Sequence, residues 1–79
     1  MAAAKSLDTR GELCPVPVIK TSKAIKEISI GQVLEVLATD PGSKPDLEAW
    51  SRMTGHKLLA YEVQPGPPKV FRFEIQRAR

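Results

Sequence analysis

Segments with the period of a β-strand alternate along this chain with segments that have the period of an α-helix, and their order limits the possible folds. Strands are expected at residues 5–9, 32–38, 56–64 and 69–77, and helices at residues 15 to about 28 and 43 to about 54. Strand–helix–strand crossovers are nearly always right-handed, so both helices most simply lie on one face of the sheet. The order β-α-β-α-β-β therefore predicts an α/β fold, a two-layer α/β sandwich with a four-stranded mixed sheet and a C-terminal antiparallel hairpin.

The spacing of apolar residues predicts which faces are buried. The first helix should bury Val18, Thr21, Ser22, Ile25 and Ile28, and the second Leu47, Trp50 and Met53. The last two strands should turn inward Leu59, Tyr61 and Val63, and then Phe71, Phe73 and Ile75. Arg72, Glu74 and Gln76 should face outward.

The second helix carries start and stop signals in the sequence. Ser43 is expected to cap its first turn, with Asp46 three residues later completing a capping box. Pro45 falls in that first turn, where a missing N–H costs little. Gly55 predicts the end of the helix, because glycine adopts the left-handed conformation easily.

Length and composition set further limits. The 79 residues predict a single domain, residues 1–79, and the one cysteine excludes both an internal disulfide and a Cys-x-x-Cys redox pair. No apolar run is long enough for a membrane span, and residues 1–5 show no secretory signal, so a cytoplasmic location is expected. The net charge of +3 fits a solvated surface, an acidic protein partner or weak contact with RNA.

Cys14 is the candidate catalytic residue. Pro15 is favoured at the first helical position, which would place Cys14 at the cap, where cysteine is a poor choice for stability. The helix dipole favours a thiolate there, although Pro15 and Pro17 lack N–H groups, so a modest fall in the thiol pKa is expected, with help from Arg10 or Lys20. The alternative is that Cys14 is a small buried hydrophobic residue, as most free cysteines are.

The chain resembles the TusA/SirA family of small sulfur-carrier proteins from Leu7 to about Ile75. The resemblance rests on Leu7-Asp8, Gly11, Cys14-Pro15-x-Pro17, Lys20, Gly31, Asp40-Pro41-Gly42-Ser43, Asp46, Trp50 and Gly55-His56. It implies a two-layer α/β sandwich and a single TusA-like sulfur-carrier domain. Ser51 departs from relatives that carry a second cysteine after the tryptophan, which removes a resolving thiol but leaves one-cysteine transfer intact.

The resemblance also implies a sulfurtransferase that works as a persulfide carrier. Cys14 would accept sulfur from a cysteine desulfurase or a rhodanese-like donor and pass it to a downstream acceptor protein, as in tRNA 2-thiouridine synthesis or other sulfur trafficking. Gly11, Pro15 and Pro17 would support the site. No metal, organic cofactor, direct DNA binding or membrane contact is expected, and the chain is expected to be a monomer.

Several other residues allow two interpretations. Asp8 and Arg10 either have a role at the site, in which they orient the loop before Cys14 or touch a partner, or serve ordinary turn chemistry. His56 is expected to have a structural or hydrogen-bonding role rather than to pair with the cysteine.

Two carboxylates, one tryptophan and three lysines also allow a structural or a functional interpretation. Asp40 and Asp46 are interpreted as turn and capping residues rather than as paired carboxylates, and Trp50 as core. Lys20, Lys23 and Lys26 form either a solvated helix face or a basic docking strip for an acidic partner.

A different class of function remains open, namely a small RNA- or protein-binding regulatory module without catalysis. A fold of this type is compatible with RNA binding. The chain has four aromatic residues, however, and most are expected in the core, so no stacking platform for bases is visible.

Overall fold

Two helices and four strands follow one another in the expected order in a computed structural model, which describes residues 3–79. The elements are β1 (Lys5–Thr9), α1 (Val16–Ala24), η1 (a 3-10 turn, Ile25–Glu27), β2 (Val33–Ala38), α2 (Ser43–Thr54), β3 (Lys57–Gln64) and β4 (Val70–Gln76). Met1 and Ala2, which begin the segment expected to lack a secretory signal, lie outside the described residues.

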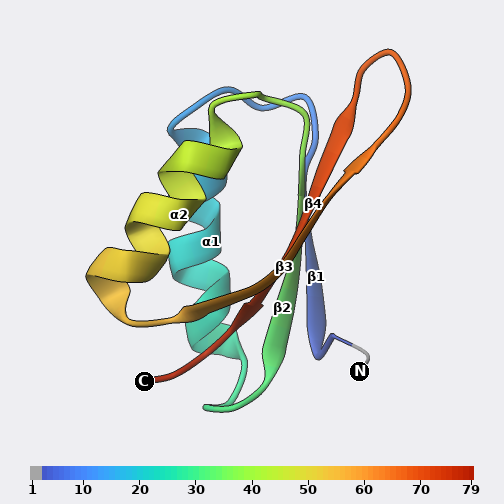
Figure 1. Cartoon of the computed structure of the whole chain (residues 1–79). Coiled ribbons are helices and arrows are strands. Elements are labelled where there is room, and N and C mark those ends of the chain that lie inside the picture. The colour runs from blue at the N-terminus through green and yellow to red at the C-terminus, as the bar shows by residue number, and fades with distance from the viewer. Residues whose placement is uncertain (1–2) are drawn as a thin grey trace.

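The strands form one mixed sheet in the order β1-β2-β4-β3. β1 pairs with β2 in parallel, whereas β4 is antiparallel to both β2 and β3. Both helices lie on the same face of the sheet, as Figure 1 shows. The predicted two-layer α/β sandwich is therefore confirmed.

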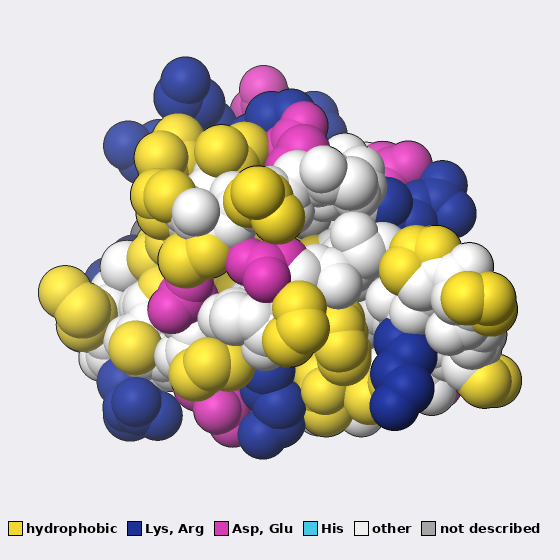
Figure 2. All heavy atoms as spheres, turned by 90° about the horizontal axis from the view of Figure 1, so that it is seen from above, with side chains coloured by type: hydrophobic (Ala, Val, Ile, Leu, Met, Phe, Trp, Pro, Cys, Tyr) yellow, Lys and Arg dark blue, Asp and Glu magenta, His cyan; other side chains and the backbone are white. Residues whose placement is uncertain are grey.

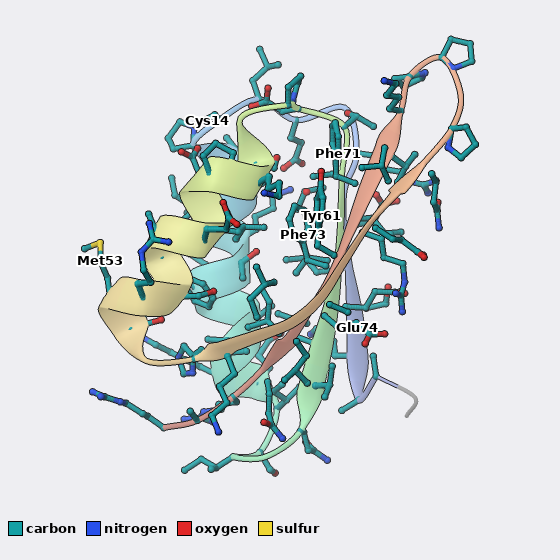
Figure 3. All side chains as sticks on the ribbon, viewed as in Figure 1. Cys14, Met53, Tyr61, Phe71, Phe73 and Glu74 are labelled. Carbon is teal, nitrogen blue, oxygen red and sulfur yellow. The ribbon has the colours of Figure 1, made fainter. Side chains whose placement is uncertain are left out.

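The core lies between the helices and the two central strands. Its buried members are Ala24, Ile25, Ile28, Leu34, Val36, Ala38, Leu47, Phe73 and Ile75. The ring centroids of Tyr61 and Phe73 are 5.2 Å apart, and both side chains point from the sheet toward the helices (Figure 3). Glu74, the next residue along β4, lies on the opposite face, as the two-residue period of a strand requires.

The helix starts differ from the sequence expectation. α1 begins at Val16 rather than Pro15, and its last predicted turn is the 3-10 turn η1. The capping box at α2 is wrong, because the N-cap residue is Gly42 and no side chain caps the helix. The Oγ atom of Ser43 is instead buried with no hydrogen-bond partner within the described chain. The physical reason is that Gly42 already has helical backbone angles, so Ser43 lies inside the first turn rather than before it.

Three apolar residues expected in the core lie at the surface. Met53 is 86% exposed. A spacing of three residues is less than one helical turn, so two such steps place Met53 on a different side of the helix from Leu47. Leu59 is 49% exposed, since a register shift between Leu58 and Ala60 breaks the alternation of β3. Val63 is 45% exposed because this end of the hairpin extends beyond the helices (Figure 1).

Gly55→Ala is expected to destabilise the fold by about 1–2 kcal/mol, because an L-residue is disfavoured in the left-handed region. Gly55 ends α2 with a φ of 81°, as predicted, and its N–H donates to the carbonyl of Ser51. Gly42→Ala is the matched control, since Gly42 has a helical φ of −69°. Urea denaturation measures both, and equal free energies of unfolding for the two variants would contradict this account.

Candidate functional site

Two loops that are far apart in the sequence meet at one end of the sheet. β1 and β2 are parallel, so the loops that follow them lie at the same end. The N–H of Gly11 donates to Oγ1 of Thr39 at 2.9 Å, and the N–H of Cys14 donates to Oδ2 of Asp40 at 2.8 Å. These hydrogen bonds attach the loop that contains Cys14 to the loop that follows β2.

Cys14 has an exposed side chain at this end of the molecule (Figure 3). The interpretation as a buried hydrophobic residue is therefore wrong. Its expected place at the helix cap is also wrong by one residue, because Pro15 is the N-cap of α1 and Pro17 is the second residue of the helix. The N–H of Val16 is already donated to the carbonyl of Leu13 and Pro17 has no N–H, so neither of the first two helical residues offers a donor to a thiolate.

Two carboxylates face Cys14 instead of the expected cations. The Sγ of Cys14 donates to Oδ2 of Asp46, on the first turn of α2, while Asp40 accepts from the backbone N–H of Cys14. The hydrogen bond to Asp46, with burial and the charges of Asp46 and Asp40, raises the pKa of the Cys14 thiol. The predicted fall in pKa is thus wrong, because the folded chain places a carboxylate that accepts the thiol proton beside Cys14 rather than a cation.

Arg10 and Lys20, which were expected to help the thiolate, are paired elsewhere. Arg10 lies with Nη2 2.8 Å from Oδ2 of Asp8, and this contact lowers the pKa of Asp8 to about 2. Asp8 also accepts from the backbone N–H of Arg10, which is the ordinary turn chemistry considered above. Lys20 pairs with Glu12, so this pair also remains within the loop and the start of α1.

A shallow groove of about 370 Å³ runs from the cysteine between the two helices. Its lining consists of Cys14, Pro15, Val18, Asp46, Ala49, Trp50 and Met53. Figure 2 shows this end of the molecule with acidic side chains set among hydrophobic ones. Trp50, expected in the core, is only partly buried, because one part of its side chain packs on the core and another lines this groove.

His56 has the structural role expected for it. Its Nδ1 accepts from the N–H of Ala78 at 3.1 Å, and its ring lies 5.3 Å from that of Trp50. Burial, followed by the positive charges of Arg77 and Arg79, lowers the pKa of His56.

This pKa shift predicts a pH dependence of stability. The unfolded chain takes up the His56 proton first as the pH falls through 6.5, the ordinary value. The free energy of unfolding should therefore be constant above that pH and decline between it and the lower pKa of the folded state. In His56→Asn, which keeps an acceptor for Ala78, melting temperatures from about pH 8 to about pH 5 should lack this decline. Parallel profiles for the two proteins would contradict the assignment.

Sequence reasoning missed Asp40 and Asp46 as neighbours of Cys14. They were assigned to a turn and a capping box, and neither assignment places them beside the thiol. The usable signal was the parallel pairing of the first two strands, because polar groups after the carboxyl ends of such strands converge at one edge.

Residues 3–79 were also compared with the requirements of a metal site and of a membrane-spanning helix, and they meet neither. That part of the chain holds no group of three or more His, Cys, Asp or Glu side chains placed to bind a metal ion. It also contains no helix with the length and apolar character needed to cross a membrane.

Comparison with known proteins gives consistent results. The family model described as Sulfurtransferase TusA matches residues 5–77. YrkI of Bacillus subtilis, named a candidate sulfur carrier protein, is 46% identical over 77 residues, which cover 98% of this chain and 99% of YrkI. YrkF of the same organism, named likewise, is 48% identical over 64 residues, but these cover 81% of this chain and only 35% of YrkF, so the chain spans about a third of that relative.

Two more relatives extend the comparison. The sulfur carrier protein TusA of Allochromatium vinosum is 38% identical over 74 residues, covering 94% of this chain and 93% of the relative. The crystal structure of a SirA-like protein from Desulfitobacterium hafniense matches with a TM-score of 0.74 and 26% identity, covering 95% of this chain and 99% of that one.

Proposed function

Because the chain belongs to the TusA family of sulfur carrier proteins, we propose that Cys14 is the residue that carries the sulfur, as a persulfide. The observation that supports this most is the exposure of its thiol on a loop held by hydrogen bonds to the neighbouring loop. A group that passes an atom between proteins must be reachable and held in place, and Cys14 satisfies both conditions.

The proposed loading step is a thiol–persulfide exchange. The Cys14 thiolate attacks the terminal sulfur of a donor persulfide, so that a new S–S bond forms and the donor's own S–S bond breaks. The bonding pair leaves with the donor thiolate, which then takes up the proton. The terminal sulfur has moved to Cys14, and no external oxidant or reductant is consumed.

The proposed unloading step repeats the exchange with an acceptor. Cys14 is the only cysteine of the chain, so no second thiol displaces the sulfur. The acceptor thiolate attacks the terminal sulfur, and Cys14 returns to its free form. The donor is a cysteine desulfurase or a rhodanese-like protein, and the acceptor is a protein of a cytoplasmic sulfur relay, such as that for tRNA 2-thiouridine.

The open face of the sheet favours this function over RNA binding. Tyr61, Phe71 and Phe73 lie on the helix side, where bases cannot stack on them (Figure 3). On the open face, Arg72 is paired with three acidic side chains, those of Glu35, Glu62 and Glu74. Arg72 is thus already engaged by carboxylates, which oppose the binding of a phosphate group there.

Mass spectrometry of the intact protein tests the proposal. After incubation with a cysteine desulfurase and cysteine, and in a parallel sample with a rhodanese-like donor, the chain should gain the mass of one sulfur atom. Treatment with a small thiol should remove it. A chain that gains no sulfur from either donor, and that instead binds RNA in a salt-sensitive way, would establish the binding-module alternative.

A further inference from the structure

We propose that Asp46 controls the protonation of Cys14: its carboxylate holds the thiol proton at rest and favours an incoming sulfur partner that presents positive charge next to its disulfide or persulfide. This inference rests on the proposed function, because it concerns the reactivity of the carrier thiol. It assigns a role to a residue outside the Cys-Pro-x-Pro segment.

The geometry around Sγ supports this role directly. Asp46 is the acceptor for the thiol proton, and it is the only titratable residue besides Cys14 in the lining of the groove. The carboxylate comes from the first turn of α2, a separate element from the loop that holds the cysteine. Asp46 is partly buried, so its charge is less screened than that of a fully exposed carboxylate.

The other charged groups near the thiol leave this negative charge uncompensated. From the loop after β2, Asp40 adds a second carboxylate, and its charge acts on Cys14 in the same direction. From the cysteine's own loop and α1, the cations Arg10 and Lys20 are already paired with Asp8 and Glu12.

Among residues 3–79, none of the ion pairs involves Asp40 or Asp46. Although the chain as a whole is positive, the charged side chains that act on its thiol are the carboxylates of Asp46 and Asp40. A partner with a Lys or Arg beside its reacting sulfur complements this site, whereas an anionic partner is repelled.

The same contact has a chemical use in the transfer step. As a donor approaches, the proton on Sγ moves to the Asp46 carboxylate or to water, and the thiolate then forms the new S–S bond. The thiolate that leaves the donor takes up a proton from Asp46 or from water, so Asp46 ends as a carboxylate and the number of protons is unchanged. Negative charge beside Cys14 lowers the fraction of the thiol that is ionised. The thiolate that does form is more nucleophilic, because nucleophilicity rises with thiol pKa.

The pH dependence of reaction with a neutral disulfide, 4,4′-dithiodipyridine, tests the proton-holding role. Removing the carboxylate that accepts the thiol proton, in Asp46→Asn, should lower the pKa of Cys14. Well below the pKa, the variant should react about threefold faster, because the gain in thiolate is partly offset by lower nucleophilicity. Above both pKa values it should react about threefold more slowly, so the two profiles should cross.

The crossing distinguishes protonation from mere access to the thiol. A variant that only exposes Cys14 differently would change the rate by the same factor at every pH. Asp46→Glu should restore the wild-type profile because it keeps the charge, and Asp46→Ser should behave like Asp46→Asn if the latter folds poorly. The matched control is Glu48→Gln, which removes a carboxylate from the same helix, where Glu48 pairs with Lys44 rather than facing Cys14.

The charge preference is tested by the ratio of rates with a cationic disulfide, cystamine, and a neutral one, hydroxyethyl disulfide. This ratio should fall about fivefold in Asp46→Asn at a fixed pH, as expected for one charge a few ångströms away in water. Unchanged profiles and an unchanged ratio in Asp46→Asn would overturn the proposal, even if Cys14 still carried sulfur. Failure of sulfur loading with a crossing profile would instead overturn the proposed function alone.

Discussion

Replacing Cys14 by serine is expected to reduce sulfur loading at least about 10³-fold, to the background of the assay. A serine hydroxyl has the shape of the thiol but cannot form a persulfide. The fold should be retained, because substitutions of exposed side chains usually change stability by less than about 0.5 kcal/mol. Mass spectrometry after incubation with donor measures the loading, and circular dichroism with a melting curve verifies the fold.

A relocated thiol is the matched control for this prediction. The double variant Cys14→Ser/Ser29→Cys keeps one exposed cysteine but places it after η1, away from the loop that carries Cys14. It should take up little sulfur from a protein donor. Equal loading of this variant and the wild type would show that any exposed thiol suffices, and would contradict the assigned site.

Phe73→Ala is expected to be the most destabilising single substitution among those considered, with a loss of about 3–5 kcal/mol. The side chain of Phe73 is fully buried on the central strand β4, beside the ring of Tyr61. For 79 residues a total stability of about 4–12 kcal/mol is typical, so this loss removes much of it. Urea denaturation followed by circular dichroism measures the effect.

Leu59→Ala serves as the comparison for the core substitution. The sequence pattern placed Leu59 in the core with Phe73, but the structure leaves it about half exposed. Its truncation should cost less than about 1 kcal/mol, because little apolar surface is returned to water. Similar losses for the two variants would mean that β3 is paired in a different register from the one described.

The fold was predictable because its signals are local and repeated. Residues 69–77 alternate strictly, and the structure buries Phe73 and Ile75 as that alternation requires. Gly55 marked the end of α2 correctly, since a residue with positive φ is a property of the local chain. Periodicity of this kind follows from backbone geometry alone and needs no knowledge of distant partners.

Features that depend on distant partners were not predictable in the same way. The irregularity in β3 at Leu59 depends on its pairing with β4, and the sequence of the strand alone gives no sign of it. Asp46 was assigned to its own helix because three-residue spacing from Ser43 fits a capping box. Its actual partner, Cys14, is 32 positions away, and only the parallel pairing of β1 and β2 brings the two together.

Cys14 has one property that the sequence predicted correctly and one that it predicted wrongly. The proline pattern correctly placed the cysteine beside the start of a helix, and its exposure follows from that place. The direction of its pKa shift was predicted wrongly, because the local sequence offers the helix dipole and two cations, whereas the folded chain supplies two carboxylates. Charge near a site is therefore a property of the tertiary structure rather than of the neighbouring sequence.

Return of the sulfur to its donor tests most directly whether this chain is a carrier. The protein is loaded from a cysteine desulfurase with isotopically labelled cysteine, purified, and mixed with excess desulfurase that has no cysteine substrate. Since thiol–persulfide exchange is reversible, labelled sulfur should leave Cys14 and arrive on the desulfurase. Label that stays on this chain, or that leaves only as free sulfide without reaching the second protein, would contradict the central claim.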